Sequence, residues 1–299
     1  MKILVAVDQN PYSAHAVLEL AKLSANTWAH VSLLAVVSKS DVKERGADVD
    51  PAPALSAHPV VEALFAHHEA FLSYFEERGG PYPYRWSGQN KELVEVRKGV
   101  YEVAQNPKPG QKRLDIRVRT GNPAKEILSE AKEQEIDLIV LGCDALKGCG
   151  WEGDSTVPRK VANDAPCSVL IAKPLKEVKR MICCLDHDRV SQVSLEMINQ
   201  MVTLHGAQLT IAGLTEHHNL KTEVEKKLLN ILRYYHERGI DPWIEVVDIA
   251  FLDSFIAEKA REGLMALWMG KQSILEKAFS KSQVGKLIKG SDTSVLILR

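Results

Sequence analysis

The sequence predicts an α/β protein of two tandem, doubly wound domains, each with a five-stranded parallel sheet and helices on both faces. Two observations lead to this prediction. Short continuous apolar runs, typical of strands that are buried on both faces, alternate with amphipathic helical stretches. The same order of runs also occurs twice along the 299 residues, a length that accommodates two domains of ordinary size.

The internal repeat consists of three kinds of segment that recur in the same order. A basic residue, five apolar residues and an aspartate come first, then an apolar run that ends in glycine, then a final apolar run. Their copies lie at 2–8 and 180–186, at 138–142 and 266–270, and at 168–171 and 294–297. The first two kinds of segment stand much farther apart in the first half, which predicts an insertion near residues 38–112.

In the first half, the predicted strands cover residues 2–7, 30–37, 115–119, 137–141 and 168–172. Asn10-Pro11 and Asn122-Pro123 each combine a helix N-cap residue with a proline at the first helical position. Helices are therefore expected to start at these two points. Residues 173–179 form a linker, so the first domain is predicted to cover 1–174 and the second 175–299.

The second half repeats the plan, with strands near residues 180–185, 208–213, 243–249, 264–269 and 294–298. The sequence ends on its last predicted strand. We expect this strand to lie at a sheet edge that has to be covered, and pairing with another domain is one solution.

The insertion is predicted to contain an amphipathic helix over residues 60–78, because its apolar side chains recur at helical spacing. Three interpretations are open for this helix: it packs on its own domain, it forms a dimer surface, or it acts as a lid over the crevice at Asp8.

Composition argues against several classes of protein. Lys and Arg number 38 against 39 Asp and Glu, a net charge of −1, so no strong field attracts nucleic acid or an anionic membrane. The sequence shows neither a signal peptide nor an apolar run long enough for a membrane span. Five cysteines, an odd number, suit reduced thiols in a cytoplasmic protein better than a disulfide framework.

No catalytic or metal-binding pattern stands out. The glycine-lysine phosphate loop, the serine-hydrolase elbow and the zinc-protease helix motif are all absent from the sequence. The pairs His67-His68 and His217-His218 are interpreted as surface histidines, since adjacent residues on a helix point in different directions. Cys143 and Cys149 lack the further ligands of a zinc site, and a redox-responsive pair is the alternative. We predict no metal and no catalytic residue.

The chain resembles the universal stress protein family. The resemblance rests on the strand that ends in Asp8, the Gly-Asn-Pro helix start at 121–123, the run Asp-Leu-Ile-Val-Leu-Gly at 137–142, and Ala-Pro-Cys before the last strand of the first half. Two copies of the family pattern together extend over almost the whole chain, and the second copy matches less well. The resemblance implies an adenine-nucleotide α-hydrolase-like fold, dimers through the last strand and, in one branch, binding of ATP or AMP.

In that branch the loop after the glycine-ended strand holds the phosphates, with backbone amides and a helix N-terminus as donors. Here Gly142 and the spacing are kept, but Ala145 and Ser155 replace two glycines of the family pattern. Phosphate binding and a ligand-free connector both remain open. The resemblance assigns these residues to a nucleotide site in the first copy: Ala6, Val7, Asp8, Val36, Leu141, Gly142, Ala145, Ser155, Thr156 and Val157.

The second copy carries the corresponding positions Asp186, Gly270, Ser273 and Ser282, with a shorter loop and fewer glycines. For Asp8 and Asp186 a capping role at the start of the next helix is the alternative to ligand contact.

Three functions follow as expectations. The first is a stress-response regulator that binds an adenine nucleotide in its first domain and acts as a homodimer, or through pairing of its own two domains by their last strands. The second is a nucleotide-free interaction scaffold. The third is a slow ATP hydrolase, for which the sequence offers no recognisable catalytic group.

Overall fold

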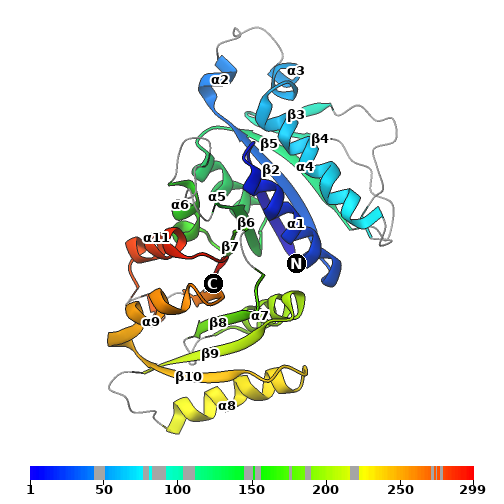
Figure 1. The fold of residues 1–299 in the computed structure, drawn as a ribbon. Helices are drawn as coiled ribbons and strands as arrows, with labels where there is room; N and C mark the ends of the chain where they lie inside the picture. The colour runs from blue at the N-terminus through cyan, green and yellow to red at the C-terminus, as the bar shows by residue number, and fades with distance from the viewer. Residues whose placement is uncertain are drawn as a thin grey trace. The chain divides into compact units, whose positions relative to one another are not determined.

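A computed structural model describes the chain in two compact units, residues 1–172 and 173–299 (Figure 1). The residues described are 1–43, 51–76, 81–82, 92–103, 112–144, 151, 156–174, 177–185, 190–215, 222–270, 273, 275–276 and 279–299. Each unit has its own run of hydrogen-bonded strands and its own buried apolar core.

The first unit alternates strands and helices around one sheet. Its elements are β1 (Lys2–Val7), α1 (Pro11–Asn26), β2 (His30–Val37), α2 (Lys39–Lys43), α3 (Pro51–Ser56), α4 (Pro59–Glu76), β3 (Leu93–Arg97), β4 (Val100–Val103), β5 (Leu114–Thr120), α5 (Pro123–Glu133), β6 (Leu138–Gly142), α6 (Val157–Asp164) and β7 (Ser168–Ala172). The strand order is β7-β6-β1-β2-β5-β4-β3.

Five of these strands, from β7 to β5, are parallel and confirm the predicted core of the sheet. Strands β1 and β6 are buried along almost their whole length because helices cover both faces. Right-handed crossovers place α1 and α4 on one face and α5 and α6 on the other, and each of these two pairs packs together.

The first sheet differs from the prediction by two extra strands. The insertion supplies the antiparallel hairpin β3–β4, and β4 pairs with the edge of β5. Its turn uses Gly99 at φ +74°, a conformation that glycine adopts without steric cost. The expected helix of the insertion is confirmed as α4, which packs on α1 and β2 of its own unit.

The described residues of the second unit form no such hairpin. Its elements are β8 (Arg180–Leu185), α7 (Gln192–His205), β9 (Gln208–Thr215), α8 (Thr222–His236), β10 (Trp243–Asp248), η2 (Ile249–Phe251), α9 (Leu252–Lys259), β11 (Leu264–Trp268), α11 (Lys281–Gly290) and β12 (Val295–Leu298). Its order is β10-β9-β8-β11-β12, all parallel, as the repeat predicts.

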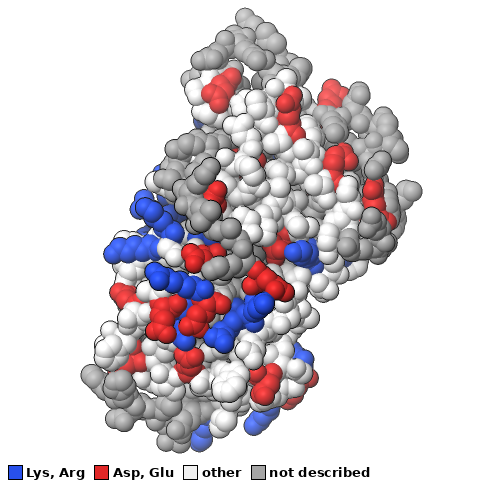
Figure 2. Space-filling model, in the orientation of Figure 1, with Lys and Arg blue, Asp and Glu red and all other residues white. Residues whose placement is uncertain are grey.

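No helix within the described parts of the chain is long and apolar enough to cross a membrane. On the face shown in Figure 2, basic and acidic side chains are interspersed, in keeping with the net charge of −1.

A buried group of charged side chains joins α5 to β5 and β4. Glu130 of α5 is fully buried, and its carboxylate lies 2.7 Å from Arg117 Nη1 and 3.0 Å from Arg119 Nε. Arg117 also reaches Glu102 of β4 at 2.6 Å, which connects the hairpin to the group. Burial lowers the pKa of Arg119, although the charges of Glu130 and Glu126 oppose this effect. Each charge is thus compensated by partners from a neighbouring element.

We expect Glu130→Gln to lower the free energy of unfolding by about 3–5 kcal/mol, because it leaves two buried guanidinium groups short of one negative charge. The matched control is Glu135→Gln, whose exposed ion pair with Lys2 should contribute less than about 1 kcal/mol. Urea unfolding measures both. Equal effects of the two variants would contradict this account of the buried group.

Candidate functional site

The strand order reverses between β1 and β6 in the first unit and between β8 and β11 in the second. From β1 the chain moves outward to β2 and β5, then returns to β6 on the other side of β1. In open parallel sheets of this kind, ligands bind at the carboxyl ends of the strands on either side of this reversal. The candidate site of the first unit is therefore the edge where β1 ends at Val7 and β6 ends at Gly142.

The Asp8 side chain, which follows β1, is fully buried and hydrogen-bonded to the start of α1. Its Oδ1 accepts from the Asn10 amide at 3.0 Å and from Ser13 Oγ at 2.7 Å. Its Oδ2 accepts from Asn10 Nδ2 at 2.6 Å and from the Tyr12 hydroxyl at 2.7 Å. Both carboxylate oxygens thus already have two donors each from the protein itself.

Gly142 lies directly against the first turn of α1. A Cβ atom at this position would stand 2.4 Å from the Tyr12 carbonyl oxygen and 2.7 Å from its ring. Only glycine allows this approach, so its place at the end of β6 has a packing cause that is independent of any ligand. Tyr12 thereby contacts both sides of the reversal point.

The inserted helix α4 also reaches this edge. The ring of His67 donates a hydrogen bond to the Asp8 backbone, and the Asp8 charge lies close enough to act on it. Burial lowers the pKa of His67, and these two interactions with Asp8 oppose the shift. His67 is half-buried and His68 is buried, so the interpretation of this pair as surface histidines is wrong. The pattern misled because α4 packs on α1 and β2.

The other predicted residues of the first unit fall into three groups. Ala6, Val7, Val36 and Leu141 are buried in the sheet, and Ala6 is the register partner of Leu141. Thr156 is the N-cap residue of α6 and Val157 its first residue, and the Thr156 side chain makes no capping hydrogen bond. Ala145 and Ser155 lie outside the described residues.

In the second unit, Asp186 lies outside the described residues. Gly270 is packed against the Trp268 ring, to which a Cβ would approach within 2.4 Å. Ser273 is buried, and its Oγ accepts from the Glu276 amide at 2.9 Å. Ser282 is exposed in the first turn of α11, whose capping box is formed by Ser280.

Sequence reasoning did not identify Tyr12, His67 or Trp268 as residues of these sites. Tyr12 and His67 belong to helical patterns that only the fold brings to Asp8. Trp268 occupies a strand position that reads as core, and its indole nitrogen is buried without a hydrogen-bond partner.

The cysteines have different environments. Cys183 and Cys184 are buried in β8, as predicted, and burial raises the pKa of the Cys184 thiol to about 12. Cys167 is also free and buried. Cys143, just after β6, is disulfide-bonded, whereas Cys149 lies outside the described residues. Among the described residues, no group of three or more His, Cys, Asp or Glu side chains is arranged to hold a metal ion.

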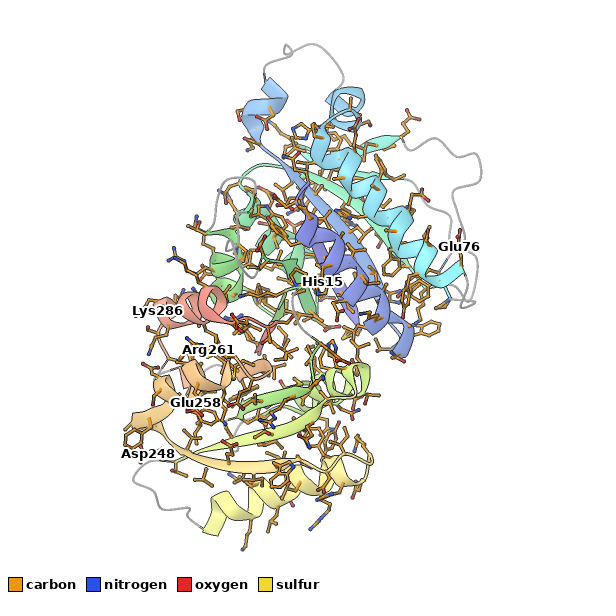
Figure 3. The ribbon with its side chains drawn as sticks, in the orientation of Figure 1. His15, Glu76, Asp248, Glu258, Arg261 and Lys286 are labelled. Atoms are coloured by element: carbon orange, nitrogen blue, oxygen red, sulfur yellow. The ribbon has the colours of Figure 1, made fainter. Side chains whose placement is uncertain are left out.

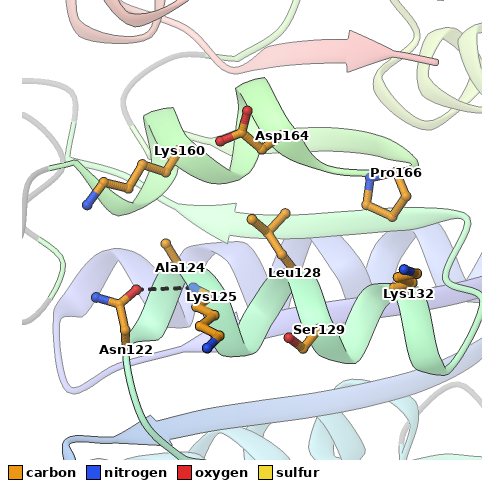
Figure 4. A pocket seen from close by; sticks show the side chains of 9 residues that line it. All are labelled: Asn122, Ala124, Lys125, Leu128, Ser129, Lys132, Lys160, Asp164 and Pro166. Carbon is orange, nitrogen blue, oxygen red and sulfur yellow. Dashed lines mark hydrogen bonds between the residues drawn. The ribbon is translucent and has the colours of Figure 1, made fainter.

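Each unit also has a surface groove between the two helices that precede its last two strands. The groove between α5 and α6 has a volume of about 560 Å³ and carries Lys125 and Lys132 on its α5 side (Figure 4). The corresponding groove of the second unit lies between α9 and α11, with Arg261 just after the end of α9 and Lys286 on α11 (Figure 3). Surface lysines of this kind are usually solvated, and they add no argument for a ligand.

The comparisons with known proteins agree with this architecture. The family model described as "Universal stress protein family" matches residues 1–173. The universal stress protein YxiE of Bacillus subtilis is 32% identical over 83 residues, and the match covers 26% of this chain. It spans only 56% of the length of that relative.

Two solved structures share the fold over nearly the full chain. A universal stress protein from Archaeoglobus fulgidus superposes with a TM-score of 0.59 at 14% identity, covering 100% of this chain and 98% of that one. A putative universal stress protein from Pseudomonas aeruginosa has a TM-score of 0.52 at 15% identity, with coverages of 99% and 92%. At these identities the likeness shows the fold.

We expect the stability of the first unit to fall as the pH decreases below about 6.5, because the unfolded chain binds a proton at His67 more readily than the folded one. The free energy of unfolding continues to fall until the pH reaches the lowered pKa of His67 in the folded state. His67→Gln should reduce this slope between about pH 7 and pH 5. The control is His236→Gln, at an exposed ring. Urea unfolding at several pH values measures the slopes, and equal slopes in both variants would refute the assignment.

We expect Asp8→Ala to lower the free energy of unfolding by about 1–3 kcal/mol, because buried donors of Asn10, Tyr12 and Ser13 lose their acceptor. Asp241→Ala, at an exposed carboxylate, should change it by less than about 0.5 kcal/mol. Thermal and urea unfolding compare them. A variant at position 8 as stable as the wild type would show that these hydrogen bonds do not hold α1.

Proposed function

Because the chain belongs to the universal stress protein family, we propose that it is a cytoplasmic stress-response regulator whose first unit binds an adenine nucleotide, ATP or AMP. We further propose that it acts through association of its domains, as a homodimer or by pairing of its own two domains through the last strands β7 and β12. The observation that carries the nucleotide proposal is the start of α6, where the Thr156 side chain makes no capping hydrogen bond, beside the reversal point of the first sheet.

The start of α6 suits a phosphate group. The first turn contains no acidic residue, the Thr156 side chain makes no capping hydrogen bond, and Pro158 has no amide to satisfy. Backbone N–H groups at a helix N-terminus, together with the helix dipole, favour an anion at this position. Because α6 leads from β6 to β7, its start lies at the same edge of the sheet as Gly142.

The base and ribose would lie toward the ends of β1 and β2, near Ala6, Val7 and Val36. A ribose hydroxyl that bonds to Asp8 has to replace one of its present donors. The Tyr12 hydroxyl is the best candidate for displacement, because Asn10 and Ser13 are fixed by the backbone at the start of α1 whereas the tyrosine hydroxyl lies at the end of a longer side chain. Nucleotide binding is thus coupled to a movement of Tyr12.

A second candidate function is a nucleotide-free interaction scaffold. The hydrogen bonds of Asp8 favour it, because each of its carboxylate oxygens already accepts two hydrogen bonds from residues at the start of α1. The packing of Tyr12 on Gly142 favours it as well. In this case the aspartate has only its capping role, and the family fold is retained for contacts with partners.

Isothermal titration with ATP and AMP tests the choice, with native mass spectrometry of the freshly purified protein to detect co-purified nucleotide. We expect binding by the wild type and loss of binding in Thr156→Glu, because the new carboxylate repels phosphate at the start of α6. The variant should remain folded, since an acidic side chain suits this end of a helix.

The matched control is Ser282→Glu in the first turn of α11, which changes the corresponding helix of the second unit. We expect the Ser282→Glu variant to bind ATP or AMP in the first unit with the affinity of the wild type. If the wild type neither co-purifies with nucleotide nor binds it in solution, the scaffold function is correct. If Thr156→Glu binds as well as the wild type, the phosphate does not lie at α6.

A further inference from the structure

The two repeats differ at the edge of the sheet that follows the third parallel strand. In the first unit this strand is β5, and the antiparallel strand β4 pairs with its outer side. In the second unit the corresponding strand is β10, and it stands at the end of the strand order. Within the described residues, β9 is the only strand that pairs with it.

Exposed apolar side chains accompany this open edge. Trp243 begins β10 and is 69% exposed, Val246 is 45% exposed, and Phe251, just beyond the strand in η2, is 58% exposed. A row of unpaired backbone groups next to apolar side chains is a template for another strand. Figure 1 shows β10 as the outermost strand of the second sheet, and Figure 3 marks its end at Asp248.

The outer strand of the first unit, β3, shows what a protected edge looks like. Its register is interrupted between Glu95 and Arg97, and both of these exposed residues are charged. Bulges and charges are devices that prevent pairing of edge strands. Strand β10 pairs in unbroken register over all six residues, from Trp243 to Asp248. Its edge therefore lacks the interruption found in β3.

We propose that β10 is an interface for a second copy of this chain, in which the two β10 strands pair antiparallel around a two-fold axis and join the second units into one continuous sheet. The first unit provides the precedent, because an antiparallel strand covers the corresponding edge there. This surface is distinct from the last strands, and the inference does not require a bound nucleotide.

Charge and side-chain alternation select the register. A two-fold axis perpendicular to the sheet keeps side chains of the same face together across the interface. The residue at this axis therefore stands opposite its own copy in the partner strand. Centring on Glu245 would place two carboxylates opposite each other, which is unfavourable. Centring on Val246 places valine against valine and Ile244 against Asp248, and it pairs the strand from Ile244 to its end.

This register is also self-complementary in its aromatic residues. Trp243 stands at the start of β10 and Phe251 just past its end. Antiparallel pairing brings the start of one strand beside the end of the other, so the exposed indole of one copy meets the region of the exposed Phe251 of its partner. A parallel arrangement would leave the two aromatic ends apart. Aromatic side chains are enriched in protein interfaces because each of them buries a large apolar area.

Cross-linking tests the register directly. Val246→Cys places two thiols opposite each other across the axis, and paired Cα atoms about 4.5–5.5 Å apart fall within the range of a disulfide. We expect mild oxidation to convert this variant largely into a covalent dimer of the 33.2 kDa chain, seen on non-reducing gels. Val94→Cys on β3, a valine of similar exposure at 51%, is the matched control and should not cross-link. The wild type reports any cross-linking by native cysteines.

Sedimentation tests the association itself. Val246→Lys places two ammonium groups opposite each other, and we expect the dissociation constant of the dimer to rise by about tenfold or more. Trp243→Lys is a second variant at an exposed position, and Val94→Lys is the control. Circular dichroism verifies that each is folded.

A wild type that stays monomeric, a Val246→Cys variant that cross-links no more than Val94→Cys, or unchanged association in both Val246→Lys and Trp243→Lys would overturn the proposal. Because ATP titration of Val246→Lys reports the first unit separately, failure of this interface and failure of the nucleotide site give different results.

Discussion

The contact between the first turn of α1 and the ends of β1 and β6 fixes the geometry of the first unit. Asp8 holds this turn through Asn10, Tyr12 and Ser13, and Gly142 permits its close approach to β6. Because the strand order reverses at this point, the contact determines how much space remains at the edge where ligands of such sheets bind. His67 of α4 also interacts with Asp8, next to the same turn.

This contact creates a physical conflict at the candidate site. A buried carboxylate needs donors in the absence of a ligand, and here α1 supplies them. A nucleotide has to compete with these intramolecular bonds, whose donors are already held in place by the helix start. At the N-terminus of α6, the Thr156 side chain makes no capping hydrogen bond with which a phosphate would compete. Phosphate binding at α6 therefore displaces no capping bond of Thr156, whereas ribose binding at Asp8 has to displace a donor. The affinity for a nucleotide depends on the sum of these two contributions.

The two repeats also manage their outer edges differently. The insertion in the first unit contributes a hairpin, which the buried group around Glu130 fixes to α5 through Arg117 and Glu102. Among the described residues of the second unit there is no hairpin, and β10 retains exposed apolar side chains. The same parallel core thus gives one closed edge and one open edge, because an edge strand requires either a partner or a protective irregularity.

Much of the architecture follows from local pattern. Continuous apolar runs predict parallel strands because both faces of each strand are covered, and Asn122-Pro123 predicts the start of α5, where the Asn122 side chain accepts from the Lys125 amide. The repeat of these runs predicts the strands of both sheets. The insertion helix is likewise readable from its apolar spacing. The hairpin is not, since the short segments of β3 and β4 carry mixed exposed and buried residues.

The sequence by itself determined the order along the chain of the parallel strands, the family resemblance and the placement of Asp8 and Gly142 at strand ends. These properties depend on neighbours along the chain. Only the tertiary structure decided that Tyr12 packs on Gly142, that His67 reaches Asp8, that Arg117 and Arg119 are buried against Glu130, and that β10 has an open edge. Each of these depends on contacts between segments far apart in sequence, and side-chain burial at such contacts has no local periodic signal.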